Sequence, residues 1–288
     1  MTHYASTKFA VRSCPLLMIV CLVCGQWSSA QETQSDGTGN SSRYQPGVRN
    51  SRERPLNAKQ LYSLVETLRQ KSGFRGLEFD AYGFLRLGDR SHIDGGSSAA
   101  RDLLIAAVDR GRAIDLESHH RTSEVAFARL ASSVSYISKA TGNRIEVYPI
   151  QIDFSDFAHL RGDREAIEAF DLGFVVLHEL AHAALGLRDA MVEGQEPGEC
   201  EEYINRIRRE LGVAERQSYS AQTRLERPFL SQKPVHQAEL LFAKQTLAPK
   251  ARPQMLSLSW EAERVGIVRP VNDKPQTIPR RSQASIAP

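Results

Sequence analysis

The apolar residues between Pro55 and about Tyr219 recur with two different periods, which together predict a mixture of helices and strands. Spacings of three and four predict helices, whereas alternation of apolar and polar residues predicts strands. Glycine or a tyrosine–glycine pair stands where several of these patterns stop, as expected of helix ends and turns. In chain order the predicted elements are a helix over 56–68 ended by Gly73, a hairpin over 77–87, a helix over about 98–108, and strands over 113–117 and 144–153.

The longest helical pattern runs over about 165–187. Asp163 is placed to cap its start, and Gly186 is placed to end it. A second helix is predicted over about 199–211. Together with the strands, these helices predict an α+β fold.

The segments on either side of this region have a different composition. Residues 31–54 are rich in Ser, Gly, Gln and Asn and poor in apolar residues, which predicts a flexible linker. Eight of the thirteen prolines lie at or beyond Pro228, and the end of the chain is rich in Lys and Arg. Residues 221–288 are therefore predicted to form a Pro-rich basic extension, partly disordered, with one helix over 237–247. The folded domain is predicted to span 55–220.

The first thirty residues have the three parts of a secretory signal peptide. Lys8 and Arg12 precede an apolar run over 15–25, and small residues lead up to a cleavage position near Ala30. The apolar run is shorter than the roughly twenty residues that a membrane span needs. We therefore expect export, to the periplasm or the medium, without an integral membrane span after cleavage.

Cysteine usage and charge narrow the class of protein further. Three of the four cysteines lie within the signal peptide, so the exported chain keeps Cys200 alone and has no internal disulfide. The formal net charge of +3 is small, and no stretch has the broad basic character of a nucleic-acid-binding face. We expect a folded protein that does not bind nucleic acid. The sequence gives no indication of its oligomeric state.

Residues 178–182 read His-Glu-Leu-Ala-His, inside the strongly apolar helix. Positions four apart share one face of a helix, so His178 and His182 can bind one metal ion. Zinc is the metal that this pattern favours, and Glu179 beside it can take the proton of a zinc-bound water. Two imidazoles and a carboxylate are costly in an apolar helix unless they have a role. The sequence therefore predicts a Zn²⁺ site with Glu179 as the general base.

Two other interpretations of the motif stay open at this point. Its histidines can face solvent or satisfy hydrogen bonds in the core, in which case the chain is an exported non-catalytic binding protein with a vestigial or structural helix. The motif is also compatible with a zinc hydrolase that acts on a non-peptide amide. Tightly bound zinc, together with an activity that depends on Glu179, would exclude the binding protein.

A catalytic zinc normally has a third protein ligand, and four acidic residues after the motif are candidates for it. These candidates are Asp189, Glu199, Glu201 and Glu202. The motif followed by a second helix with acidic residues resembles the zincins, and among them the members that take a glutamate as third ligand. That resemblance implies Glu202, which lies twenty residues after His182. Those members have an aspartate four residues after the ligand, where this chain has Arg206.

The resemblance also implies a fold and an activity. The fold is a zincin-like α+β domain, in which a small mixed or antiparallel sheet packs on the helix with the motif and the second helix completes the metal site. The activity is zinc-dependent hydrolysis of peptide bonds in a peptide or protein substrate. Over 56–219 the chain also loosely resembles the small zinc peptidase domains of bacterial secreted effectors and toxins. Tyr219, Tyr203 and His236 are candidates for a group that stabilises the oxyanion.

Overall fold

The computed structural model describes residues 45–122, 125–137, 142–190, 197–227, 234–246 and 252–267. All of them belong to the second of the two units into which the chain divides, which spans 40–288. The predicted signal peptide and most of the predicted linker lie outside the described residues. Within the described ranges, no helix combines the length and the apolar character that crossing a membrane requires.

The first sheet is mixed. Its strands, in spatial order, are β1 (Gly47–Asn50), β4 (Ala113–His119), β7 (Arg144–Asp153) and β5 (Ala128–Leu130), and β6 (Val134–Ile137) also pairs with β7. Strands β1, β4 and β7 run parallel to one another, whereas β5 and β6 run antiparallel to β7. The strands predicted over 113–117 and 144–153 are confirmed as β4 and β7.

Two helices and a small hairpin lie between β1 and β4 in the sequence. They are α1 (Ala58–Ser72), β2 (Glu78–Phe79), β3 (Leu85–Arg86) and α2 (Ser98–Asp109). Helix α1 begins where Asn57 and Gln60 cap each other's backbone N–H groups, and it ends at Gly73, which has a φ of 78°. The side chain of Ser97 caps α2 by accepting from the N–H of Ala100. These elements follow the predictions because local caps and turns fix their ends.

The helix predicted over 165–187 is interrupted. It consists of α3 (Arg164–Glu168), α4 (Leu172–Leu180) and a π-helical turn, η3 (Ala181–Leu185). A new helix start forms at Asp171, whose side chain accepts from the N–H of Phe174. The predicted cap at Asp163 makes no such side-chain bond. Helix α5 (Gly198–Glu210) confirms the second predicted helix.

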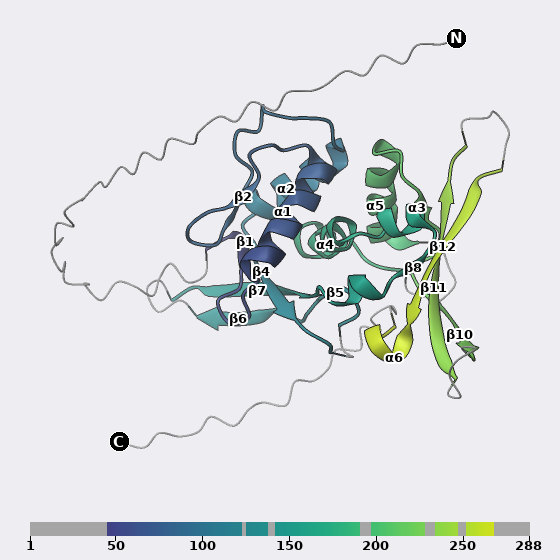
Figure 1. Cartoon of the computed structure of the whole chain (residues 1–288). Coiled ribbons are helices and arrows are strands. Elements are labelled where there is room, and N and C mark those ends of the chain that lie inside the picture. Colours follow the sequence, from purple (N-terminus) through teal and green to yellow (C-terminus); the bar gives the residue numbers. More distant parts are fainter. Residues whose placement is uncertain are drawn as a thin grey trace, which may run out of the picture. The chain divides into compact units, whose positions relative to one another are not determined.

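Helix α4 lies in the middle of the described part of the chain (Figure 1). It contacts β5 and β7 of the first sheet on one side, and α1, α2 and α5 on others. Every residue of α4 is buried. The larger hydrophobic core is formed by these helices and the first sheet. Helices packed on a mostly separate set of strands make this an α+β fold, as predicted.

The three longest strands of the second sheet lie in the segment predicted as a Pro-rich extension. Its antiparallel strands are, in spatial order, β10 (Gln222–Glu226), β11 (Val235–Lys244), β12 (Gln254–Glu261) and β8 (Arg161–Gly162). Strand β9 (Glu215–Arg216) also pairs with β11. The short helix α6 (Ala262–Val265) follows β12. The prediction of a helix over 237–247 is wrong. Ala238, Leu240 and Phe242 are buried at every second position, which is the period of a strand. The folded part therefore extends past residue 220.

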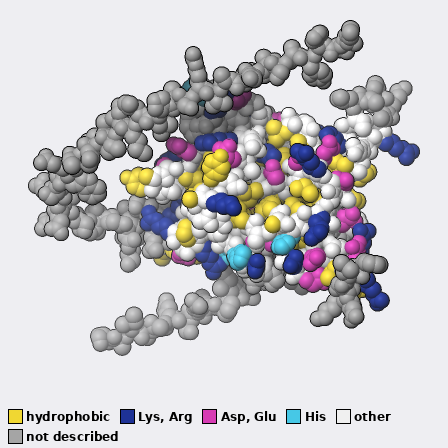
Figure 2. Space-filling view, in the orientation of Figure 1, with side chains coloured by type: hydrophobic (Ala, Val, Ile, Leu, Met, Phe, Trp, Pro, Cys, Tyr) yellow, Lys and Arg dark blue, Asp and Glu magenta, His cyan; other side chains and the backbone are white. Residues whose placement is uncertain are grey.

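A cluster of aromatic rings ties this sheet to the rest of the unit. The ring of Phe127 meets those of Phe170 and Trp260 edge to face, with centroids 5.0 Å apart in each case. Phe242 and Val175 belong to the same buried cluster, and Val175 is a residue of α4. The second sheet thus packs against the helix that carries the histidine motif. On the face shown in Figure 2, basic and acidic side chains are interspersed around the apolar ones.

Strand β1 lies inside the segment predicted as a flexible linker. The buried side chain of Arg49 donates two hydrogen bonds, of 2.6 and 2.7 Å, to Asp115 on β4. The same two residues are partners in the register of the sheet. A guanidinium can be buried here because a carboxylate meets it in a two-bond geometry. The linker prediction is therefore wrong for 47–50.

A buried carboxylate beside β5 makes stability depend on pH. Asp156 begins the short helix η2 (Asp156–His159) and accepts from the N–H of Phe127 at 2.9 Å. Burial raises the pKa of Asp156 to about 7; the bond from Phe127 opposes this rise, and Asp153 adds to it. Between about pH 4 and pH 7 the folded state keeps a proton that the unfolded chain has lost. Stability therefore falls as the pH rises through this window.

We expect Asp156→Asn to stabilise the fold more at pH 8 than at pH 5. Asparagine keeps an acceptor for the N–H of Phe127 and removes the charge, a gain of roughly 1–4 kcal/mol at pH 8. Thermal unfolding of both proteins at the two pH values measures the difference. An equal difference at pH 5 and pH 8 would contradict the raised pKa.

Candidate metal centre

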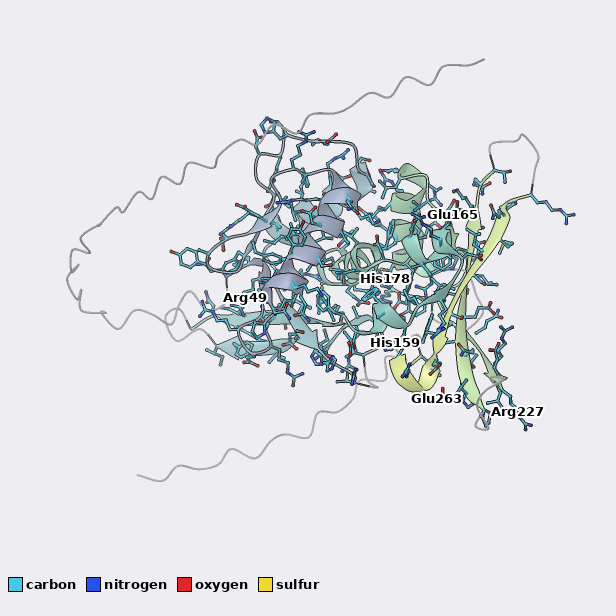
Figure 3. All side chains as sticks on the ribbon, viewed as in Figure 1. Arg49, His159, Glu165, His178, Arg227 and Glu263 are labelled. Carbon is cyan, nitrogen blue, oxygen red and sulfur yellow. The ribbon has the colours of Figure 1, made fainter. Side chains whose placement is uncertain are left out.

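The histidine motif is divided between α4 and η3. His178 and Glu179 lie in the last turn of α4, and His182 lies in the π-helical turn that follows. Such turns are common at functional sites. Figure 3 shows His178 in the interior of the described part, on α4 and away from the labelled surface residues Arg227 and Glu263. His178 and Glu179 are thus carried by a helix of which every residue is buried.

Three donor atoms converge beside this helix. Nε2 of His178 and Nε2 of His182 lie 3.1 Å apart, and Oδ1 of Asp189 lies 3.0 Å from the first and 3.2 Å from the second. A zinc ion with bonds of about 2.0–2.1 Å holds its nitrogen and oxygen ligands about 3.3 Å apart in a tetrahedron. The three atoms, called the donor triangle below, are therefore nearly equidistant and only slightly closer together than one face of a zinc site.

Each histidine ring has a polar neighbour at its other nitrogen. Nδ1–H of His182 donates to the carbonyl of Leu187 at 2.6 Å, because a carbonyl can only accept. In the neutral ring, Nε2 then has a free electron pair with which it can bind a metal ion. Nδ1 of His178 lies 3.3 Å from Oε2 of Glu201. This separation is an ion-pair distance, although the angles do not make it a hydrogen bond. Carbonyl and carboxylate partners of this kind orient metal-binding histidines.

The charges in the cluster favour a cation between the rings. Burial alone lowers the pKa of His182, but the neighbouring Asp189 and Cys200 outweigh burial and raise the pKa to about 10. Burial raises the pKa of Asp189, and the two histidines outweigh it and hold that pKa below its usual value. The largely buried carboxylate thus requires positive charge beside it, which a proton or a metal ion can supply.

The start of α5 holds Asp189 beside the histidines. The N–H of Cys200 donates to the carbonyl of Arg188 at 3.0 Å, and the N–H of Arg188 donates to Glu199 at 3.2 Å. Gly198 has a φ of 76°, and a Cβ at this position would lie 2.3 Å from the backbone that follows Asp189. A side chain is therefore excluded where the two segments touch.

Glu202, which the family resemblance implied as third ligand, lies away from the histidines. Its side chain is 57% exposed and pairs with Arg209 at 2.7 Å. Successive residues of a helix point about 100° apart, so Glu202 faces solvent while its neighbour Glu201 is buried. Glu199 is also exposed and binds backbone instead. Of the four acidic candidates, the described structure brings Asp189 to the Nε2 atoms.

Glu201 lies at the centre of a buried ionic network. It accepts hydrogen bonds from Arg208 and, at 3.1 Å, from Arg216 of β9. Burial raises the pKa of Glu201, but the two guanidinium groups outweigh burial and hold that pKa well below its usual value. Glu201 is therefore an anion that faces Nδ1 of His178. The chain has Arg206 where the resembling members have an aspartate, and the structure places the carboxylate of Glu201 3.3 Å from Nδ1 of His178.

Glu179 is bound to the edge of the first sheet. Its Oε2 accepts from the N–H of Leu130 in β5 at 2.6 Å. Burial raises the pKa of Glu179, and His178 and His182 act against the rise. Beside it is a pocket with an empty volume of about 400 Å³, including the solvent at its mouth. The pocket is lined by Ala126, Phe127, Ala128, Phe170, Phe174, Val175, His178, Glu179, Glu201, Arg208, Arg216 and Tyr219.

Among the candidates for oxyanion stabilisation, Tyr219 lies at this site. Its ring stacks on that of His178, with centroids 5.7 Å apart and planes 20° from parallel. The hydroxyl of Tyr203 donates to the carbonyl of Ala99, away from the pocket. His236 pairs with Glu263 on an exposed surface.

The comparisons with known proteins add no relative to this picture. No family model, no curated protein and no solved structure matches the chain. Its function therefore has to be argued from the donor atoms and their surroundings.

Proposed function

We propose that this chain is a zinc-dependent metallopeptidase in which His178, His182 and Asp189 bind the metal and Glu179 acts as general base. The observation that carries the proposal is the donor triangle, with edges of 3.0, 3.1 and 3.2 Å. Buried Glu179 lies next to it, on the same helix as His178. Two imidazoles and one carboxylate match the composition of catalytic zinc sites, which keep one position open.

A zincin-like character of the fold is part of this proposal. Two observations support it: a mixed sheet packs on the helix with the motif, and α5 contributes Glu201 behind His178. The third ligand differs from the glutamate type, because Asp189 precedes α5 instead of lying on it. We also place the activity outside the cytoplasm, on the basis of the predicted signal peptide.

In the proposed hydrolysis, the metal and Glu179 have different roles. A zinc ion in this position supplies Lewis acidity, which polarises a substrate carbonyl and makes water acidic near neutral pH. Glu179 takes the proton of the attacking water and passes it to the leaving amine. The N–H of Leu130 fixes Oε2 of Glu179, so that Oε1 is left to carry the proton. Because burial raises the pKa of Glu179, the base is better matched to neutral pH.

The pocket beside Glu179 supports a peptide substrate with an apolar side chain near the cleaved bond. Its apolar lining includes Phe127, Phe170 and Phe174. Pockets of this kind bind side chains through burial, with a few polar groups to fix orientation. Tyr219 lines the same pocket and is the candidate donor to the developing oxyanion.

Zinc content and peptide hydrolysis of Glu179→Gln test the proposal. We expect wild type and variant to bind about one zinc per chain, and the variant to lose about 10²–10⁴-fold in kcat/KM. Elemental analysis gives the zinc content, and a library of quenched fluorescent peptides gives the rates. Glu168→Gln is the matched control, since Glu168 is exposed and pairs with Arg164 at the surface.

Three outcomes would contradict the proposal in different ways. A chain that binds no zinc under any condition favours the non-catalytic binding protein. Undiminished hydrolysis in Glu179→Gln removes the general base. Cleavage of non-peptide amides, but of no peptide, identifies a different zinc hydrolase.

A further inference from the structure

A fourth metal donor lies beside the three that the proposed function uses. Cys200 is fully buried, and its Sγ belongs to a group of four ligand atoms, with those of His178, His182 and Asp189, that all lie within 4.8 Å of one another. The thiol donates to the carbonyl of His178 at 3.3 Å. A buried cysteine usually packs as a small apolar group. This one instead lies among imidazoles and a carboxylate.

The backbone fixes Cys200 relative to Asp189. The N–H of Cys200 is bonded to the carbonyl of Arg188, and Gly198 touches the chain just after Asp189. The same turn of α5 places Glu201 behind His178. Backbone contacts therefore hold the segments of the sulfur and the carboxylate together beside the histidines.

We infer that Cys200 is a fourth protein ligand of the metal and closes the site in its resting form. This inference rests on the metal site of the proposed function. A cysteine sulfur binds zinc at about 2.3 Å, and four ligands of the Cys, His and Asp types complete a tetrahedron. As the sulfur–metal bond forms, the thiol proton passes to solvent and the bond to the carbonyl of His178 is lost.

Cys200 thus has two alternative partners, the metal and the carbonyl of His178. When the sulfur is on the metal, four protein ligands leave no position for water or substrate. When it returns to the carbonyl and regains a proton, three protein ligands and one open position remain. The first form stores the metal, and the second is the form that the proposed peptidase needs.

Cobalt substitution tests this inference without relying on hydrolysis. Co²⁺ enters zinc sites and gives visible bands when it is bound in a tetrahedron, and a cobalt–thiolate bond adds a charge-transfer band in the near ultraviolet. We expect both sets of bands in the wild-type chain. Cys200→Ser should lose the charge-transfer band, keep bound cobalt, and bind zinc about 10–100-fold more weakly. If this variant does not fold, the spectrum of the wild-type protein without its predicted signal peptide decides, because Cys200 is its one cysteine and no other thiolate can give the charge-transfer band.

The outcomes separate this inference from the proposed function. Bound cobalt without a charge-transfer band, or a band that survives in Cys200→Ser, would overturn the role of Cys200 and leave the three-ligand site standing. A wild-type chain that binds neither cobalt nor zinc would overturn both.

Discussion

Replacing Asp189 with alanine is expected to weaken zinc binding by at least about 100-fold, because it removes one corner of the donor triangle. Glu202→Ala is the matched control. It removes a carboxylate close by in sequence, which is exposed and paired with Arg209, and it should leave the affinity unchanged. Competition with a chromophoric chelator measures both affinities on the same scale.

The reverse result would restore the interpretation drawn from the family resemblance. If Glu202→Ala loses zinc while Asp189→Ala keeps it, the glutamate is the ligand, and α5 has to rotate when the metal binds. If neither variant loses zinc, the two histidines hold it with other partners.

Replacing Glu201 with glutamine is expected to destabilise the fold by about 3–5 kcal/mol, because two buried guanidinium groups lose their shared anion. For a domain of this size the melting temperature should fall by roughly 10 °C. Thermal unfolding in the presence of a chelator measures the effect without any contribution from metal. Glutamine has nearly the same shape as glutamate, so the loss reports on charge and not on packing.

Glu202→Gln provides the comparison for Glu201 as well. Its surface pair with Arg209 is worth at most about 1 kcal/mol, so its melting temperature should stay close to that of wild type. A Glu201→Gln protein as stable as this control would mean that Arg208 and Arg216 are satisfied by their backbone and side-chain acceptors alone.

The sequence predicted the two histidines correctly as neighbours, because positions four apart on a helix must share a face. It did not single out the third member of the triangle. Spacing along the chain does not determine which face of α5 turns inward, and a shift of one residue separates buried Glu201 from exposed Glu202. Asp189 was among the candidates, but its proximity depends on how Gly198 lets two backbone segments touch.

The fold was predictable where local signals set the ends of helices and strands. It was not predictable where contacts with residues distant in sequence determine whether an element forms. Helix α1 ends at its glycine as expected. Strand β1 was missed because Arg49 is buried in an ion pair with Asp115 of β4, which no hydropathy pattern reveals. In β11, apolar residues such as Leu241 and Ala243 fall on both faces and blurred the alternation, so a helix was predicted there.

The donor residues are close together in the sequence, and this has a consequence for how the chain folds. Asp189 follows His178 by 11 positions, and Cys200 follows it by 22. Closing short loops costs little entropy, and contacts between near neighbours form early. A metal ion adds its binding free energy to whatever structure first brings its ligands together. Zinc bound at the proposed site would therefore favour early contacts between α4 and the start of α5.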